Sequence, residues 1–346
     1  MTRAVRLRNA VVQLNDWGWK NIAITDRPIA SLRPQEIRVH VRAASLNHRD
    51  LMLIEGRFPD AHRLPLVLLS DCAGEVIEIG SEVTRFWVGD RVAPAPYPVW
   101  VNGPFSPSVM ASGLGAGTDG VLGSYFSGNQ RGFVAIPEGF SFEEAATLPC
   151  AALAAWNALF EQGNLKPRQS VLVLGSGGVS TFALQFAVAS GAHVIAITGT
   201  DSKVERLQEL GASHVISYRR SPDWSHEVLD VTSGVGVDCV VETGGAGTLD
   251  QSIKAAAVGG SVSVTGMLTG AYGTFDSLPI LRKTLHVQGV VGGSVEMFDR
   301  MNGTIETLGI RPVIDRTFEM HHIVEALKYL ESGQHVGKVV VRVSHR

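Results

Sequence analysis

The stretch SVLVLGSGGVS, residues 170–180, decides the fold because a short apolar run leads directly into a glycine-rich turn. Gly175 permits a tight turn, and Gly177 lets the backbone approach a pyrophosphate closely. A helix that begins near Gly178 directs its first free N–H groups at that anion. Ser180 replaces the third glycine of the GxGxxG pattern and is small enough for close packing of helix on strand. The expected phosphate contacts are Gly175, Ser176, Gly177, Gly178 and Val179.

The same region contains six short apolar runs that alternate with helical patterns. Runs that are apolar on both faces suit the strands of a parallel sheet covered by helices on each side. The sequence therefore predicts an α/β fold with a doubly wound parallel sheet. The runs are residues 170–175, 193–197, 214–218, 238–242, 261–266 and 285–292.

The first 140 residues have a different texture. Proline and glycine punctuate short alternating segments such as IRVHVRA (37–43) and EVIEIG (75–80), which predicts a β-rich domain. A helical stretch follows Ser141, which is placed as an N-cap with Glu144 three residues on. The C-terminal tail adds a strand, a helix and a strand that we expect to return to the first domain. The predicted domains are 1–140 with 310–346, and 141–309.

The end of the second strand of the sheet bears on the choice of nucleotide. An NAD site normally carries an acid there, about 20 residues after the loop. Thr198 occupies that position and Gly199 and Thr200 follow, so small residues leave room for a 2′-phosphate. Lys203 offers this phosphate a positive charge, whereas Asp201 argues mildly against it. The sequence favours NADP(H).

Further nucleotide contacts are expected where other strands end, because ligands of open parallel sheets bind at the carboxyl ends of the strands. Tyr218 ends the third strand and is placed to border the adenosine phosphate, although a strand-edge aromatic residue without a function fits it equally well. The other expected contacts are Thr243, Gly244, Gly266, Met267 and Leu268.

Composition excludes several classes of partner. The 346 residues carry a net charge of −3, and the 33 acidic and 30 basic residues form no long block of one sign. This pattern provides no electrostatic footprint for nucleic acid or a membrane surface. The chain has no apolar run of about 18 residues and begins without the features of a secretory signal. We expect a cytoplasmic protein with a small-molecule partner and reduced cysteines.

Several separated motifs occur in an order that resembles one family. They are PLVLLSDCAGEVIEIGSEVTRFWVGDRV (65–92), AATLPCAALAAWNAL (145–159), the glycine-rich loop and LGASHVI (210–216). Together they resemble the medium-chain dehydrogenase/reductase superfamily over nearly the whole chain. Within it, the chain is similar to the zinc-free quinone oxidoreductase branch, whose members reduce quinones or α,β-unsaturated carbonyls with NADPH. The resemblance implies a GroES-like catalytic domain and a Rossmann domain that face each other across a cleft.

The resemblance also implies that the catalytic metal is missing. Asn47 stands where the zinc alcohol dehydrogenases of the superfamily have a cysteine, and Ser70-Asp71 stands where they have a His-Glu pair. Cys150 matches the third ligand, and one ligand of three does not hold a catalytic zinc. We therefore expect no metal site.

The segment after Asn47 also contains a rival pattern. His48-Arg49-Asp50-Leu51 spells the opening of a protein-kinase catalytic loop. A kinase requires Asn four residues after Leu51, where this chain has Glu55, and no DFG follows. The pattern therefore does not indicate a kinase.

Reduction of a conjugated carbonyl is chemistry that such a site can support. A quinone or enone accepts hydride at its β-carbon if hydrogen-bond donors stabilise the developing enolate oxygen. The amide of Asn47 is the first candidate donor, although Asn at a turn also bonds its own backbone, and Arg49 is the second. Asp50 completes the catalytic set, although a buried carboxylate that orients Arg49 or the loop fits it better than an acid.

Three hypotheses remain at the level of sequence. The leading one is an NADPH-dependent reductase of quinones or enones. The others are an alcohol dehydrogenase with atypical metal ligands and a nucleotide-binding protein that has lost catalysis. The apolar sheet edge at residues 285–293 favours a homodimer.

Overall fold

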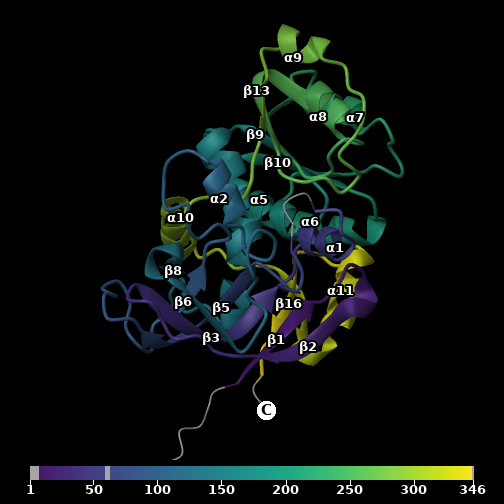
Figure 1. Cartoon of the computed structure of the whole chain (residues 1–346). Helices are drawn as coiled ribbons and strands as arrows, with labels where there is room; N and C mark the ends of the chain where they lie inside the picture. The colour runs from purple at the N-terminus through teal and green to yellow at the C-terminus, as the bar shows by residue number, and fades with distance from the viewer. Residues whose placement is uncertain (1–7, 59–62, 345–346) are drawn as a thin grey trace, which may run out of the picture. The chain divides into compact units, whose positions relative to one another are not determined.

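The computed structural model describes residues 8–58 and 63–344, and the chain divides into two compact units. The first unit comprises residues 1–150, 293–307 and 314–346, and the second comprises residues 151–292 and 308–313. Figure 1 labels many of the helices and strands of both units.

This division differs from the expected domains at two segments, 141–150 and 293–307, which group with the first unit. The first segment contains α3 (Phe142–Ala145), which packs against strands β3 (Glu36–Ser45) and β5 (Asp71–Ile79). The second contains most of α10 (Val295–Leu308), whose first N–H groups donate to backbone oxygens of Trp100 and Val101 at 2.9 and 3.0 Å. Backbone hydrogen bonds thus hold α10 in the first unit, although its place in the sequence groups it with the second domain.

The first unit is built on a seven-stranded sheet with the order β15-β16-β3-β5-β6-β8, in which β7 also pairs with β3. The pair β15·β16 is parallel and the other pairs are antiparallel. A second sheet has the order β2-β1-β4. The strands not yet bounded are β1 (Asn9–Leu14), β2 (Ile22–Arg27), β4 (Leu66–Val67), β6 (Arg91–Pro94), β7 (Tyr125–Asn129), β8 (Phe133–Ala135), β15 (Ile314–Glu319) and β16 (Lys338–Arg342).

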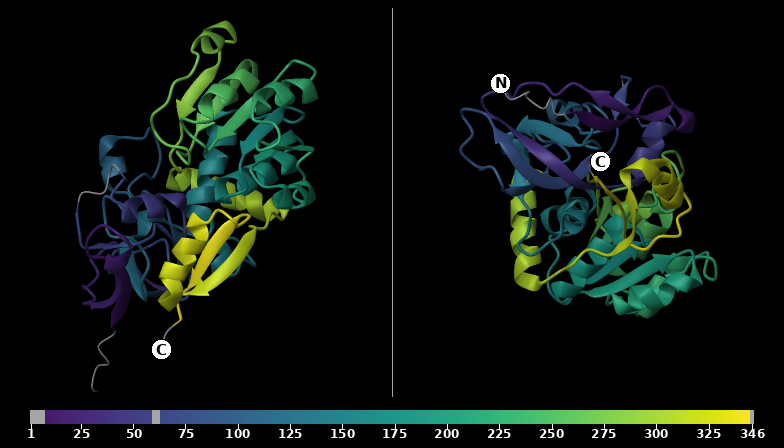
Figure 2. Two further views of the ribbon diagram at one scale, coloured as in Figure 1. Left: turned by 90° about the vertical axis from the view of Figure 1, so that its right-hand side faces the viewer. Right: turned by 90° about the horizontal axis from the view of Figure 1, so that it is seen from below.

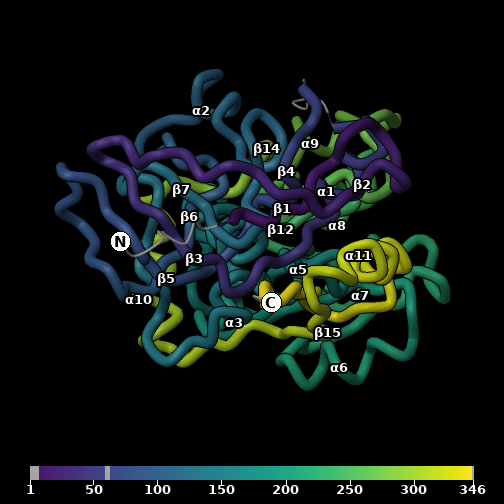
Figure 3. Tube along the Cα trace, turned by 60° about the horizontal axis from the view of Figure 1, so that its bottom comes forward, coloured from purple at the N-terminus to yellow at the C-terminus, as the bar shows by residue number. Residues whose placement is uncertain are grey.

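The C-terminal segment adds strands β15 and β16 to this sheet. Strand β16 runs antiparallel to β3, with Val340 opposite Ser45, and the trace of Figure 3 follows this return of the chain. Figure 2 shows β15, β16 and α11 (Ile323–Glu331) in yellow as one strand–helix–strand group. The other helices of the unit are η1 (Trp19–Asn21), α1 (His48–Ile54), α2 (Pro107–Ala111), η2 (Gln130–Gly132) and η6 (Met320–His322).

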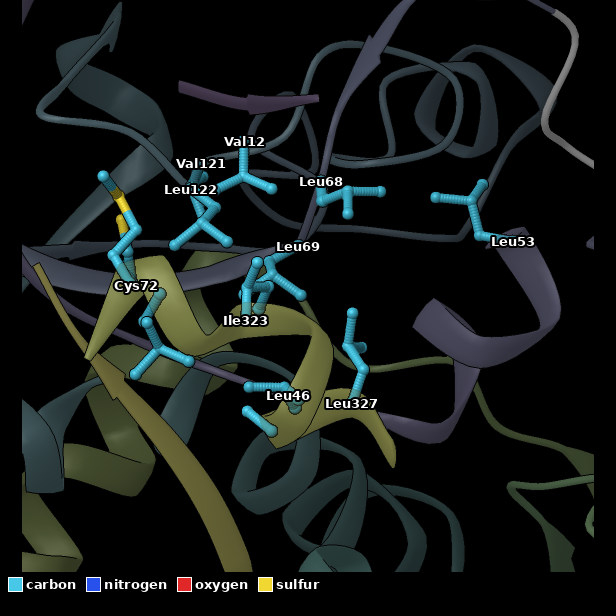
Figure 4. Packing of buried hydrophobic residues seen from close by; sticks show 14 of the residues in the cluster. Val12, Leu46, Leu53, Leu68, Leu69, Cys72, Val121, Leu122, Ile323 and Leu327 are labelled. Atoms are coloured by element: carbon cyan, nitrogen blue, oxygen red, sulfur yellow. The ribbon is translucent and has the colours of Figure 1, made fainter. Parts of the chain in front are cut away.

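Helix α11 covers the main core of the first unit. Its residues Ile323 and Leu327, spaced by four, lie on one face of the helix and are buried with Leu46, Leu69 and Cys72. Figure 4 shows these side chains together. Each fully buried leucine contributes about 1.5–3 kcal/mol. Apolar packing against α11 therefore fixes the segment that leads from β3 into α1.

The second unit contains a six-stranded parallel sheet with the order β11-β10-β9-β12-β13-β14. This is the predicted doubly wound sheet, and the fold class is confirmed. Its strands are β9 (Ser170–Leu174), β10 (His193–Thr198), β11 (His214–Ser217), β12 (Val237–Glu242), β13 (Ala256–Val264) and β14 (His286–Gly289). Strand β14 ends the order, at the edge where the sequence predicts a homodimer; that dimer stays a prediction.

Helices connect these strands. The order reverses at the central strand β9, because β10 lies on one side of it and β12 on the other. In such sheets ligands bind at the carboxyl ends of the strands beside this switch point. The helices are α5 (Gly178–Ala189), η5 (Asp201–Lys203), α6 (Val204–Glu209), α7 (Trp224–Val231), α8 (Leu249–Ala255) and α9 (Leu278–Arg282).

The helical stretch after Ser141 begins as expected. The hydroxyl of Ser141 accepts from the N–H of Glu144 at 3.1 Å, and the carboxylate of Glu144 accepts from the N–H of Ser141 at 2.8 Å, so the capping box is formed. The stretch continues as η3 (Leu148–Ala152), α4 (Leu153–Trp156) and η4 (Asn157–Gln162), of which η3 and η4 are π-helical. In the part of the chain that the structure describes, no helix is long and apolar enough to span a membrane.

Candidate functional site

The glycine-rich loop connects β9 to α5 at the switch point of the sheet. Gly175 has a φ of 82°, a left-handed conformation that suits glycine, and its N–H donates to Ile197 O at 2.7 Å. Gly177 is the N-cap of α5 and offers no side chain to cap it. Ser180 donates to Leu174 O at 2.5 Å, which holds helix and strand together. The first N–H groups of α5 therefore remain available for a phosphate.

The residues expected around a 2′-phosphate lie at the ends of β10 and β11. Lys203 donates to the hydroxyl of Ser176 at 3.1 Å, so the ammonium group lies at the glycine-rich loop. The hydroxyl of Tyr218 lies against Gly199 so closely that a Cβ at this position would overlap it. Tyr218 thus contacts both Thr198 and Gly199, because its N–H also donates to Thr198 O at 2.9 Å.

The remaining expected nucleotide residues lie in two loops that interlock beyond β12 and β13. The hydroxyl of Thr243 donates to Leu174 O at 2.8 Å, which ties the first loop to the glycine-rich turn. A Cβ at Gly266 would overlap the carbonyl oxygen of Thr243, and this oxygen accepts from the N–H of Leu268 at 3.4 Å. The structure therefore brings Thr243, Gly244 and residues 266–268 together at one edge.

Glu242 organises the first of these loops and was missed by the sequence reasoning. Its carboxylate is fully buried at the end of β12. One of its oxygens, Oε1, accepts from the N–H groups of Gly244 and Gly245 at 2.6 and 3.0 Å and from the hydroxyl of Thr248 at 2.7 Å. The other oxygen accepts from the hydroxyl of Ser252. The sequence does contain a signal for this role, because Glu242 ends an apolar run immediately before Thr243-Gly244-Gly245.

In the first unit, Asn47 precedes α1 and is fixed through its backbone. Its N–H donates to Asp50 Oδ2 at 2.7 Å, and its carbonyl oxygen accepts from the N–H of Asp50 at 3.0 Å. Burial raises the pKa of Asp50 to about 7, opposed by the positive charge of Arg49. Asp50 therefore holds the start of α1, and the roles expected for it in the site stay predictions.

Arg49, the second candidate donor, turns toward an aromatic ring. Its guanidinium carbon lies 4.8 Å from the centroid of the Phe58 ring, a distance typical of a cation–π interaction. Its charge also lowers the pKa of Asp50. Arg49 thus belongs to the neighbourhood of Asn47 and packs its charge on Phe58.

Lys338 belongs to the cluster of polar residues around Asn47, and it is the main member of this cluster that sequence reasoning did not find. The side chain is 2% exposed, and Nζ donates to Leu46 O at 2.7 Å and to Asn47 Oδ1 at 2.6 Å. Nζ also lies 3.9 Å from Asp71 Oδ2. The signal was a lysine at the start of the apolar run KVVV, since a lysine is rarely fully buried unless it is paired.

Asp71 is buried beside Lys338 and accepts two hydrogen bonds. Ser70 donates to its Oδ1 at 2.6 Å, and the N–H of Cys150 donates to its Oδ2 at 3.1 Å. Although part of Cys150 is exposed, loss of solvation and the charge of Asp71 raise the pKa of its thiol to about 12. Cys150 is therefore a neutral thiol at physiological pH and not an activated nucleophile.

The amide nitrogen of Asn47 is different from the other polar atoms of this cluster. Nδ2 is buried and has no hydrogen-bond partner among the described residues. An unsatisfied buried donor is unfavourable by about 1–3 kcal/mol, and such groups in native structures often have a functional reason. The cluster therefore contains one unused N–H donor, on the residue that the sequence selects first.

Comparison with known proteins identifies the family of this chain. Residues 33–138 match a family model described as alcohol dehydrogenase GroES-like domain, and residues 178–307 match one described as zinc-binding dehydrogenase. A zinc-type alcohol dehydrogenase-like protein of Schizosaccharomyces pombe is 41% identical over 319 residues, which cover 90% of this chain and 92% of that protein.

The chain belongs to the medium-chain dehydrogenase/reductase superfamily.

Solved structures agree with this assignment. A putative alcohol dehydrogenase from Sinorhizobium meliloti is 36% identical with a TM-score of 0.91, and covers 97% of this chain and 99% of its own. A structure called NAD-dependent alcohol dehydrogenase is 30% identical with a TM-score of 0.87, and covers 98% of this chain and all of its own. This medium-chain protein is therefore an oxidoreductase with the fold of the nicotinamide-dependent dehydrogenases.

The donor set of this medium-chain protein does not fit zinc, although the names of its relatives mention it. Zinc is held in catalytic sites by three ligands from Cys, His, Asp or Glu. Asn47 supplies an amide and Ser70 a hydroxyl, so Cys150 is the one ordinary zinc ligand of these three, and the ammonium of Lys338 contacts Asn47. Among residues 8–58 and 63–344, no three His, Cys, Asp or Glu side chains are grouped as a metal site requires.

Proposed function

We propose that this protein is an NADPH-dependent reductase of quinones or α,β-unsaturated carbonyls that works without zinc. The unused Nδ2–H donor of Asn47, at a position where the zinc enzymes carry a metal ligand, is the observation that carries the proposal. A fixed N–H donor stabilises negative charge on a substrate oxygen, which is what reduction of a conjugated carbonyl requires.

The preference for reduction follows from the chemistry of the amide that Asn47 offers to a substrate. Alcohol oxidation requires the removal of a tightly held hydroxyl proton, which a metal ion assists by lowering the pKa of the bound hydroxyl. An amide N–H has no comparable effect on an alcohol. A quinone or enone is already electrophilic, so a neutral donor is sufficient for it.

The nucleotide is proposed from the residues at the ends of β10 and β11. Thr198 stands where an NAD site normally has the acid that binds the ribose. The ammonium nitrogen of Lys203 lies at the glycine-rich loop, 3.1 Å from the hydroxyl oxygen of Ser176. The ring of Tyr218 lies against Gly199. The proposed nucleotide contacts also include residues 175–179 of the glycine-rich loop. One similar structure is called an NAD-dependent alcohol dehydrogenase, and that name describes the cofactor of that relative and not of this chain.

Bound NADPH supplies the hydride, which the substrate accepts at its β-carbon. Negative charge then develops on the carbonyl oxygen, and Asn47 donates its Nδ2–H to this oxygen. Asp50 holds the backbone of Asn47 by the 2.7 Å hydrogen bond from the Asn47 N–H. One proton completes the reduction and leaves a saturated ketone, or a hydroquinone from a quinone, with NADP⁺.

The test is a rate measurement on the purified protein with NADPH or NADH and a panel of quinones, enals and enones. We expect NADPH oxidation with at least one class of acceptor, undiminished by a strong chelator, and a catalytic efficiency with NADPH at least about tenfold above that with NADH. Elemental analysis of the same sample is expected to give far less than one zinc per chain.

An alcohol dehydrogenase is the second candidate, and the names of the relatives favour it. Its distinctive result is oxidation of simple alcohols by NAD⁺ or NADP⁺ that is lost in the chelator and regained with added zinc. Stoichiometric zinc together with that behaviour contradicts the proposed function.

A further inference from the structure

We propose that Lys338 is the positioning residue of the catalytic cluster. Its ammonium group orients the amide of Asn47 and balances the charge of Asp71, two tasks that a metal ion performs for its ligands. The inference rests on the proposed role of Asn47 as the donor to the substrate oxygen, and it adds the residue that makes this donor available.

The orientation of the amide follows from the chemistry of lysine. An ammonium group has three donors and no acceptor, so the Asn47 atom 2.6 Å from Nζ must be the carbonyl oxygen Oδ1. A rotated amide would bring its NH₂ group against the ammonium. Nδ2 is therefore directed away from Lys338, and it has no partner among the described residues. The lysine thus selects which end of Asn47 remains unused.

The anchoring of Lys338 itself fixes this geometry. Nζ donates to Leu46 O at 2.7 Å, and the N–H of Leu46 donates to Val339 O at 3.0 Å. Lysine and asparagine are thus held on adjacent backbones, at the start of β16 and just after β3. A donor held at both its backbone and its side-chain oxygen needs little reorganisation when charge develops nearby.

The charges of the cluster support the second task. Asp71 is fully buried and lies 3.9 Å from Nζ, and it forms its ion pair with Lys338 within the described part of the chain. A buried carboxylate is strongly unfavourable without such a partner. The hydrogen bond at Oδ1 also polarises the Asn47 amide, which strengthens Nδ2–H as a donor.

A double-mutant cycle tests the proposal on whichever substrate the wild-type protein turns over best. Its variants are Asn47→Ala, Lys338→Met and the pair together. We expect each single change to lower kcat by about 10²-fold or more, the usual effect of one lost donor to a developing oxyanion. Because Lys338 acts through Asn47, the double variant is expected within about threefold of Asn47→Ala. NADPH affinity and KM for NADPH remain within about threefold of wild type.

Two further variants keep the test valid if Lys338→Met does not fold. Lys338→Met with Asp71→Asn removes the charge and its partner together, and is expected to fold with the same low kcat. Asn47→Asp keeps the acceptor for Lys338 and removes the unused donor, so it is expected to fold well and to lose about 10²-fold or more in kcat. Lys328→Met, at an exposed position of α11, is the matched control and is expected to retain wild-type kcat.

Three results overturn the role of Lys338. The first is multiplication of the two single effects in the double variant, and the second is wild-type kcat in the charge-balanced variant, which reduces Lys338 to a counter-ion of Asp71. The third is wild-type kcat in Asn47→Asp, which removes the donor role of Asn47 and therefore also contradicts the proposed function. Failure of the wild-type protein to reduce any quinone or enone instead contradicts the proposed function, and with it the donor role of Asn47 on which this inference rests.

Discussion

Each unit of the protein contains a buried polar network at its candidate site, one around Glu242 and one around Asn47, and the two networks differ in what is left unpaired. Around Glu242, the carboxylate accepts from two N–H groups and two hydroxyls, and no Lys, Arg or His of the described residues forms an ion pair with it. Around Asn47, charged groups are buried together and one N–H donor has no partner.

The difference shows how a protein separates structure from chemistry. A network whose polar atoms are all satisfied by neutral donors rigidifies a loop. A network with an unused donor is less favourable for folding, and it offers that donor to a ligand. We therefore expect changes at Glu242 to alter stability and nucleotide binding first, and changes at Asn47 to alter turnover first.

The largest effect on stability is expected from Glu242→Gln. The side-chain NH₂ group of the glutamine is a donor, and it faces N–H and hydroxyl donors that the carboxylate oxygens of Glu242 accept from in the wild type. Some of these donors lose their acceptor, so the free energy of unfolding is expected to fall by about 2–4 kcal/mol. Denaturant unfolding measures it, and KM for NADPH is expected to rise severalfold while kcat at saturating NADPH changes little.

Ser252→Ala is the matched control, because it removes one donor and leaves the carboxylate in place, with an expected loss of about 1 kcal/mol. A drop of about 10²-fold in kcat for Glu242→Gln without loss of stability breaks the contrast between the two networks.

The stability of the Asn47 network is expected to depend on pH. Burial raises the pKa of Asp50 to about 7, so between pH 5 and 7 the folded protein keeps a proton that the unfolded chain releases. Wild-type stability therefore falls as pH rises through this window. Relative to wild type, Asp50→Asn is expected to gain about 2 kcal/mol in free energy of unfolding from pH 5 to pH 7.

Unfolding curves of both proteins at several pH values measure this gain. Asp16→Asn, at an exposed position, is the control and is expected to show a constant difference from wild type. A constant difference for Asp50→Asn as well shows that this carboxyl is ionised throughout the range.

The smallest effect is expected in the Rossmann unit at Lys203. Lys203→Met removes the charge proposed to bind the 2′-phosphate, so the ratio of catalytic efficiencies with NADPH and NADH is expected to fall by about tenfold, a difference of about 1.4 kcal/mol. The exposed Lys166→Met is the control. An unchanged ratio in Lys203→Met removes this residue from the nucleotide site and leaves the neighbouring Tyr218 to be tested.

The sequence predicts those parts of the molecule that depend on local pattern. Alternating apolar runs predict the six parallel strands, and the spacing of Ser141 and Glu144 predicts the capping box that the structure contains. Family resemblance selects Asn47, but its use as a donor stays a prediction. Lys338 could not be placed beside it, because their contact joins positions 291 residues apart and depends on the pairing of β16 with β3.

The separation of Asn47 and Lys338 has a consequence during synthesis. All six strands of the parallel sheet, β9 to β14, precede β16 in the sequence and are therefore synthesised before it. Asn47 acquires its lysine only after β16 has been translated and docked on β3. A chain that stops before β16 therefore lacks the ammonium group that we propose to orient the amide of Asn47.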